Sequence, residues 1–280
     1  MELLYLGTAA AEGYPALFCS CDHCRAARAL GGRDLRRRTS ALIDGELLID
    51  VGPDLLASAH ALTLSLDRVR WVLQTHRHSD HLLESNFTFR EKGFTGAAPA
   101  WWELCGSQPT IDAITAYGKL DDRRLSLRSV AAFETFSLGP YTVTALSARH
   151  DMAIDPLFYA IRRGDAALLW ANDTGPFFPE TWQALDQLAA EGVHFGFAGI
   201  EATMGTAPGD PTRPGGHMTI AQCGWHHQEL GRRRLLAPDA HQFAHHLSHF
   251  NNPPHAEMET LLRPYGVAPA YDGLRLLVRG

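Results

Sequence analysis

The stretch Thr75-His76-Arg77-His78-Ser79-Asp80-His81 decides the fold and the chemistry predicted for this chain. Its first residue, Thr75, ends the apolar segment 71–75, whose composition is typical of a β-strand, and the next six residues hold four potential metal ligands. Alternating side chains beyond a strand end can point the same way, so we expect His76 and His78 to approach one ion. The turn at Asp80 and His81 then directs two further ligands to a second ion. The stretch therefore predicts a two-metal centre.

The rest of the chain reads as one domain, residues 1–280, in which short apolar strands are followed by strands alternating with helices. This order favours an α/β architecture of two mixed sheets packed face to face with helices outside. The predicted strands are Leu3–Leu6, Ala41–Ile43, Leu47–Ile49, Trp71–Leu73, Tyr141–Leu146, Leu157–Ile161, Ala167–Trp170, Phe195–Ile200 and Leu274–Val278. The predicted helices are Pro53–Leu64, Ile111–Tyr117, Pro179–Glu191 and Thr219–Leu230, the last with Thr219 as its N-cap.

Composition limits the partners that we expect. The formal charge is −6, so nothing draws the whole chain to nucleic acid or to an anionic membrane. The chain has two clusters of arginines, one formed by Arg33 and residues 36–38 and the other by residues 232–234. We interpret both as solvated faces or helix ends, with contact to a phosphate as the alternative. No secretory signal and no spanning segment are evident, which predicts a soluble, cytoplasmic protein. A homodimer is left open.

The stretch His76-x-His78-x-Asp80-His81 resembles the metal-binding motif of the metallo-β-lactamase superfamily. That resemblance implies an αββα sandwich and three further ligands, His150, Asp173 and His246. One ion would be held by His76, His78 and His150, the other by Asp80, His81 and His246, and Asp173 would bridge them. Two divalent ions roughly 3.5–4 Å apart generate a bridging hydroxide at neutral pH. Zinc, manganese and iron all suit such ligands.

A second metal site is predicted from Cys19-Ser20-Cys21-Asp22-His23-Cys24. Three thiolates need a fourth ligand, which Asp22 or His23 could supply only with cramped geometry, so a distant residue is favoured; three reduced, buried cysteines are the alternative reading. This loop, 19–24, resembles that of PhnP-type cyclic phosphodiesterases, and the resemblance implies a structural zinc with His249 as the fourth ligand. Cys105 and Cys223 are interpreted as ordinary buried thiols.

The same resemblance implies that His217 is the catalytic acid, with Asp80 also serving catalysis. We therefore expect a metal-dependent phosphodiesterase that hydrolyses a small phosphate diester, cyclic diesters included. A tRNA 3′-processing endonuclease is one alternative, which the acidic charge and only two lysines, Lys92 and Lys119, disfavour. A metalloprotein like those of pyrroloquinoline quinone biosynthesis is another, disfavoured because all seven active-site ligands are retained. Trp101 and Trp102 either pack or line the mouth of the site.

Overall fold

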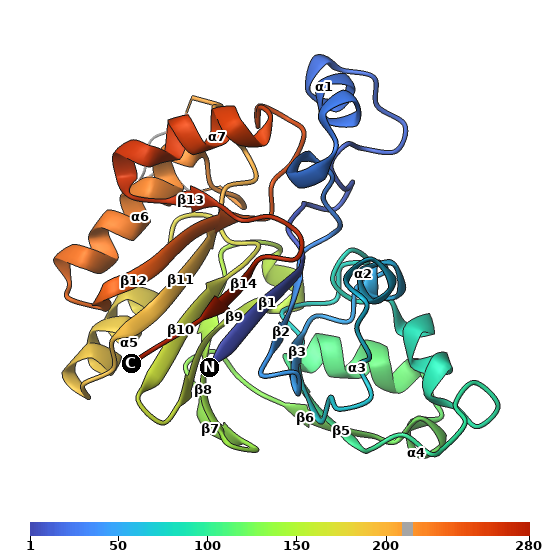
Figure 1. Ribbon diagram of the computed structural model, residues 1–280. Coiled ribbons are helices and arrows are strands. Elements are labelled where there is room, and N and C mark those ends of the chain that lie inside the picture. Colours follow the sequence, from blue (N-terminus) through green and yellow to red (C-terminus); the bar gives the residue numbers. More distant parts are fainter. Residues whose placement is uncertain (209–214) are drawn as a thin grey trace.

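A computed structural model describes residues 1–208 and 215–280. In this part of the chain the strands form two mixed seven-stranded sheets, which Figure 1 shows facing each other. The first sheet has the order β14-β1-β2-β3-β4-β5-β6 and contains β1 (Glu2–Gly7), β2 (Ser40–Ile43), β3 (Leu47–Ile49), β4 (Trp71–Leu73), β5 (Trp102–Gly106), β6 (Leu125–Ser129) and β14 (Arg275–Leu277).

The second sheet has the order β13-β12-β11-β10-β9-β8-β7. Its strands are β7 (Thr135–Leu138), β8 (Tyr141–Ser147), β9 (Leu157–Arg163), β10 (Ala166–Ala171), β11 (Phe195–Glu201), β12 (Leu236–His245) and β13 (Ala268–Pro269). The described α-helices are α1 (Asp22–Leu30), α2 (Leu55–Leu62), α3 (Gln108–Tyr117), α4 (Leu120–Arg123), α5 (Pro179–Ala190), α6 (Ile220–Arg232) and α7 (His255–Leu262).

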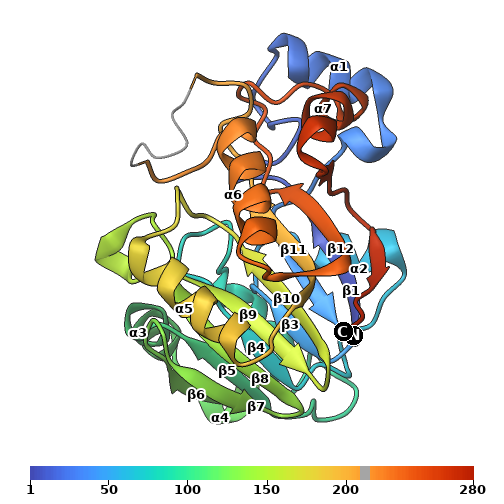
Figure 2. The same ribbon diagram turned by 90° about the vertical axis from the view of Figure 1, so that its left-hand side faces the viewer.

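Strand periodicity explains why the sheets are covered on both faces. In β1, Leu3 and Tyr5 point into the core between the sheets, while Leu4 and Leu6 point outward under α2 and α3. In β10, Trp170 faces the other sheet and Leu169 faces the helical layer of α5, α6 and α7. Both faces of these strands are apolar, so the chain buries them in a four-layer helix–sheet–sheet–helix sandwich (Figure 1), and Figure 2 looks onto its layer of α5 and α6. The predicted fold class is confirmed.

Each predicted strand and helix overlaps an observed one, with ends displaced by a few residues. The predicted N-cap is also confirmed: the Thr219 hydroxyl accepts from the backbone of Gln222, and the Gln222 side chain accepts from the backbone of Thr219. This reciprocal capping satisfies two backbone donors that a helix start leaves free, and a cap of this kind contributes about 1 kcal/mol.

Parallel pairing in the first sheet decides the role of the paired tryptophans. β4 and β5 run parallel, with Trp71 opposite Glu103, and His76 lies beyond the carboxyl end of β4. Trp102 begins β5 and Trp101 immediately precedes it, so both lie at the opposite end of the strands. Trp102 is buried under the guanidinium of Arg90, 3.8 Å from its ring centre. The suggestion that this pair lines the mouth of the site is wrong.

Among the described residues, no helix is both long enough and apolar enough to cross a bilayer.

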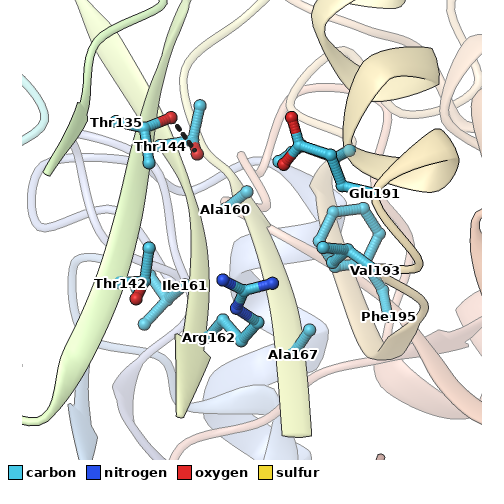
Figure 3. A pocket seen from close by; sticks show the side chains of 11 residues that line it. Thr135, Thr142, Thr144, Ala160, Ile161, Arg162, Ala167, Glu191, Val193 and Phe195 are labelled. Atoms are coloured by element: carbon cyan, nitrogen blue, oxygen red, sulfur yellow. Dashed lines mark hydrogen bonds between the residues drawn. The ribbon is translucent and has the colours of Figure 1, made fainter. Parts of the chain in front are cut away.

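The outer face of the second sheet holds a small cavity, between β8, β9 and the end of α5 (Figure 3). Its volume is about 30 Å³, which is room for about one water molecule. Thr135 and Thr144 are hydrogen-bonded to each other at its wall, 2.9 Å apart. We assign this cavity no function.

Candidate metal centre

The ligands predicted for the two active-site ions meet at one edge of the sandwich, because each follows the carboxyl end of a strand. The segment 76–81 follows β4, His150 follows β8, Asp173 follows β10 and His246 follows β12. Asp173 and His246 have φ angles of 43° and 53°. This left-handed conformation is uncommon outside glycine, and here it turns the chain sharply so that both side chains face the cluster.

Three histidines form the first cluster. The Nδ1 atom of His78 lies 3.0 Å from Nε2 of His76 and 3.1 Å from Nε2 of His150. The ligating atoms of all three residues lie within 4.8 Å of one another. Burial lowers the pKa of His76 and of His150. The neutral rings of His76 and His150 have unshared electron pairs available to a metal ion, and the ring nitrogens of all three histidines lie close enough together to share one.

Asp80, His81, Asp173 and His246 form the second cluster, whose ligating atoms also lie within 4.8 Å of one another. Asp173 reaches both clusters: its Oδ2 lies 2.6 Å from Nε2 of His81 and 3.4 Å from Nε2 of His76. Burial alone would raise the pKa of Asp80 and of Asp173, but the neighbouring imidazoles outweigh it and lower both. The site therefore holds ionised carboxylates among its imidazoles.

Unpaired polar atoms provide the test of whether this site fits metal ions. The Nε2 atoms of His81 and His246 and Oδ1 of Asp173 are buried, and although the two nitrogens lie 2.6 Å and 3.2 Å from Asp173 oxygens, none of the three atoms makes a hydrogen bond of normal geometry. Such atoms are costly to bury unless something else coordinates them. All three belong to the second cluster, so the donor set fits a divalent cation there.

The opposite ring nitrogens are held by partners that fix the ring orientations. Nδ1 of His76 contacts the Thr75 hydroxyl at 3.0 Å, and Nδ1 of His246 contacts the Thr203 hydroxyl at 2.8 Å. Nδ1 of His81 lies 2.8 Å from the buried carboxylate of Asp50. Such partners leave Nε2 of each ring directed at the cluster.

His217, the predicted acid, lies beside both clusters. Its ring centre is 4.8 Å from that of His150 and 5.9 Å from that of His246, and its Nδ1 donates to the Glu201 carboxylate at 2.8 Å. Burial alone would lower the pKa of His217, but Glu201 and Asp173 outweigh it and raise the pKa to about 9. Residues 209–214 of the loop before His217 lie outside the described residues.

Glu201 was missed in the sequence. It ends β11, is fully buried, and accepts from the backbone amides of Thr174, Thr203 and Met218 as well as from His217. The only sequence signal was a carboxylate that ends an apolar strand. Gly175 is required nearby, because a Cβ there would occupy the position of the Gly215 carbonyl oxygen.

The cysteine loop forms a separate cluster. The sulfurs of Cys19, Cys21 and Cys24 and a nitrogen of His249 lie within 4.8 Å of one another, with Nδ1 of His249 at 3.7 Å from the sulfur of Cys19 and 3.5 Å from that of Cys21. Burial would raise the pKa of Cys21, but hydrogen bonds from the Cys24 amide and His249 outweigh it and lower it to about 6. This donor set fits zinc.

The two local candidates for the fourth ligand point elsewhere. Nδ1 of His23 contacts the backbone oxygen of His249 at 3.0 Å, and exposed Asp22 pairs with Arg25. His249 follows His246 by three residues, so one short segment supplies a residue to the second cluster and another to the cysteine cluster. Cys105 and Cys223 are buried and lie in neither cluster.

The sequence matches the beta-lactamase superfamily domain over residues 46–238. No curated protein matches it. A crystal structure of a new diphosphatase from the PhnP family has a TM-score of 0.74 and 23% identity, with 99% of this chain and 98% of that chain covered. Zinc-bound PqqB from Methylobacterium extorquens has a TM-score of 0.69 and 19% identity, covering 99% and 100%. The short form of human tRNase Z has a TM-score of 0.65 and 16% identity, covering 100% of both chains.

Proposed function

This chain belongs to the beta-lactamase superfamily, and we propose that within it the protein is a metal-dependent phosphodiesterase acting on a small phosphate diester, with cyclic diesters as the first class to test. The observation that carries the proposal is the His217–Glu201 pair beside the two clusters. An imidazole held there can protonate the oxygen that leaves phosphorus. The PhnP-family diphosphatase of the same fold supports a reaction at phosphorus.

In this proposal His76, His78 and His150 would hold one divalent cation and Asp80, His81 and His246 another, with Asp173 within reach of both clusters. Bound cations of this kind would activate water and neutralise charge on phosphate oxygens. Cys19, Cys21, Cys24 and His249 would hold a structural zinc.

The residues of the chain supply the proton and its position. Because Nδ1 of His217 donates to Glu201, Nε2 is the ring nitrogen left to face a substrate. The buried Glu201 carboxylate also keeps the ring in one orientation through its three backbone hydrogen bonds. His217 is thus the catalytic acid and Glu201 is its positioning residue.

The proposal is tested with metal-replete protein and two kinds of diester. Bis-(p-nitrophenyl) phosphate releases a weakly basic phenolate that needs little protonation, whereas an alkyl or ribose cyclic diester releases a basic alkoxide. We expect His217→Ala to lower kcat by roughly 10²–10⁴-fold for the alkoxide-releasing diester and much less for the aryl diester. Glu201→Gln should also lower kcat more for the alkoxide-releasing diester than for the aryl diester, but by a smaller factor.

The matched control is His241→Ala, which changes an exposed histidine of β12 away from the clusters. It should leave both rates unchanged. If wild-type protein hydrolyses neither kind of diester and instead cleaves pre-tRNA, the endonuclease alternative replaces this proposal. Equal losses for both diesters in His217→Ala would contradict the role of His217 as the acid.

A further inference from the structure

Tyr5 of β1 reaches across the sandwich to the strand end that carries His246. Its ring centre lies 5.0 Å from that of Trp170 in the core between the sheets, and its hydroxyl lies 3.1 Å from Nδ1 of His245. β1 belongs to the first sheet, whereas His245 ends β12 of the second, and the two sheets face each other in Figure 1. This buried hydrogen bond therefore joins the two sheets.

The other nitrogen of the His245 ring connects two strands of the second sheet. Nε2 lies 3.1 Å from the backbone oxygen of Ala171, the last residue of β10. A carbonyl oxygen only accepts, so Nε2 carries a proton and donates it, and in a neutral ring Nδ1 accepts from the Tyr5 hydroxyl. The ring is fully buried, which favours this neutral form. One imidazole thus fixes the ends of β10 and β12 and the strand β1 relative to one another.

β11, which pairs with both β10 and β12, leaves the space that the contact needs. It has a glycine, Gly199, where a Cβ would lie 2.9 Å from the Tyr5 hydroxyl oxygen and from the Phe197 ring. Real Cβ atoms do not approach other atoms this closely, so a larger residue would displace one of these side chains. The glycine therefore allows the Tyr5 hydroxyl to reach His245 over β11.

The contact lies directly behind the second cluster. His245 immediately precedes His246, and Ala171 lies two residues before Asp173. Nε2 of His246 and Oδ1 of Asp173 are 3.2 Å apart. The other two members of this cluster follow β4 of the first sheet. A displacement of either strand end, or of one sheet against the other, would therefore change the spacing of the ligand atoms.

We propose that Tyr5 and His245 are positioning residues for a cation held by the second cluster. The pair sets the separation of the strand ends that carry Asp173 and His246, and it fixes the first sheet against them. Neither residue of the pair belongs to the cluster itself. The inference rests on the proposed metal centre and adds to it a hydrogen-bonded pair that supports the ligands through the backbone.

The test titrates Mn²⁺ into full-length protein from which chelatable ions have been removed, and electron paramagnetic resonance measures the free ion. Wild-type protein should bind Mn²⁺ at both active-site clusters. In Tyr5→Phe, one dissociation constant should rise about tenfold and the other should change by less than about twofold, because the pair supports one cluster. His245→Gln keeps a donor and an acceptor, so it should retain more of the affinity than His245→Leu.

Tyr141→Phe is the matched control. Tyr141 is also buried between the sheets, and its hydroxyl also bonds across them, to Asp44 and Glu46 at 3.1 Å, but at the amino end of β4, away from the clusters. Both tyrosine variants should lower the Tm, and only Tyr5→Phe should weaken Mn²⁺ binding.

Unchanged Mn²⁺ binding in Tyr5→Phe, or equal weakening in Tyr141→Phe, would overturn the inference. The titration uses no diester, so its outcome is separate from the diesterase test. Wild-type protein that hydrolyses no diester, combined with the expected loss of Mn²⁺ affinity in Tyr5→Phe, would remove the proposed activity and support the positioning pair.

Discussion

Asp50 orients a residue of the metal clusters without belonging to either cluster. Its carboxylate accepts from the backbone and hydroxyl of Thr75, from the Gln74 amide and from Nδ1 of His81, and it is fully buried. These bonds fix the strand end that carries the quoted stretch as well as the ring of His81. The sequence placed a carboxylate directly after the apolar Leu47–Ile49, but nothing local indicated what it would contact.

Asp50→Asn should weaken metal binding at the second cluster by roughly 10–100-fold, because an amide replaces one carboxylate oxygen and orients the ring less firmly. Metal content after dialysis against a competing chelator measures this. Asp44→Asn is the control, since Asp44 also follows an apolar strand but pairs with Arg163. Unchanged metal retention in Asp50→Asn would show that His81 needs no such support.

Among the elements, α6 is tied to the loop between β10 and α5 by a buried neutral histidine. Nδ1 of His226 donates to the Gln222 carbonyl at 2.7 Å, and Nε2 accepts from the Phe177 amide at 3.1 Å. Burial lowers the pKa of His226 to about 4. A protonated ring could not accept from Phe177, so this contact requires the neutral form.

This histidine makes the free energy of unfolding depend on pH. Below an ordinary pKa of about 6.5 the histidine of the unfolded chain binds a proton, whereas that of the folded chain binds one only near pH 4. The free energy of unfolding therefore falls as the pH is lowered from about 6.5 to about 4. His226→Gln should lower the free energy of unfolding at pH 7. As the pH is lowered through the window, the variant should then lose less stability than the wild type, by up to about 1.4 kcal/mol for each pH unit. Urea unfolding at pH 7, 6 and 5 measures both. An identical pH slope in the variant would contradict this account.

The elements that could be predicted from sequence are those whose own residues are distinctly apolar or periodic. β1 and β10 are continuous apolar runs buried on both faces, α6 has an apolar repeat that matches the face it buries, and all three were predicted. β12 (Leu236–His245) was missed because its first half alternates Pro, Asp and His with small residues, and its apolar character appears only near Phe243. The helix α1 was missed because its start is fixed by the thiol of Cys21.

The candidate site divides in the same way. His76 to His81 could be found from spacing alone, whereas His150, Asp173 and His246 needed a family motif, because single residues at strand ends carry little signal. Arg36 shows that a charged residue cannot be assumed to be exposed to solvent. It was interpreted as part of a solvated face, but it is buried and contacts His255 and the Ala270 carbonyl.

At the scale of the whole molecule, the clusters join parts of the chain that are distant in sequence. The cysteine cluster connects residues 19–24 to the segment after β12, and the same segment provides His246 to the second cluster. Removing one cluster should therefore loosen the wall of the other.

Metal analysis of protein expressed without added metal should give about three equivalents per chain, one of them resistant to chelation because thiolates hold it. His249→Ala should lose about one equivalent and lower the Tm while keeping the chelatable ions. His241→Ala, in the exposed part of β12, should keep all of them. If His249→Ala still binds three equivalents of metal, His249 is not a ligand of the cysteine cluster.

The ligands of the two active-site clusters are divided between the sheets: 76–81 follow a strand of the first sheet, and His150, Asp173 and His246 follow strands of the second. The chain passes from one sheet to the other between β6 and β7, at residues 130–134. Two polypeptides separated at that crossing would each carry an incomplete set of ligands. Catalysis by the mixed fragments would then report their reassembly, which would make this protein a natural scaffold for a split-enzyme sensor.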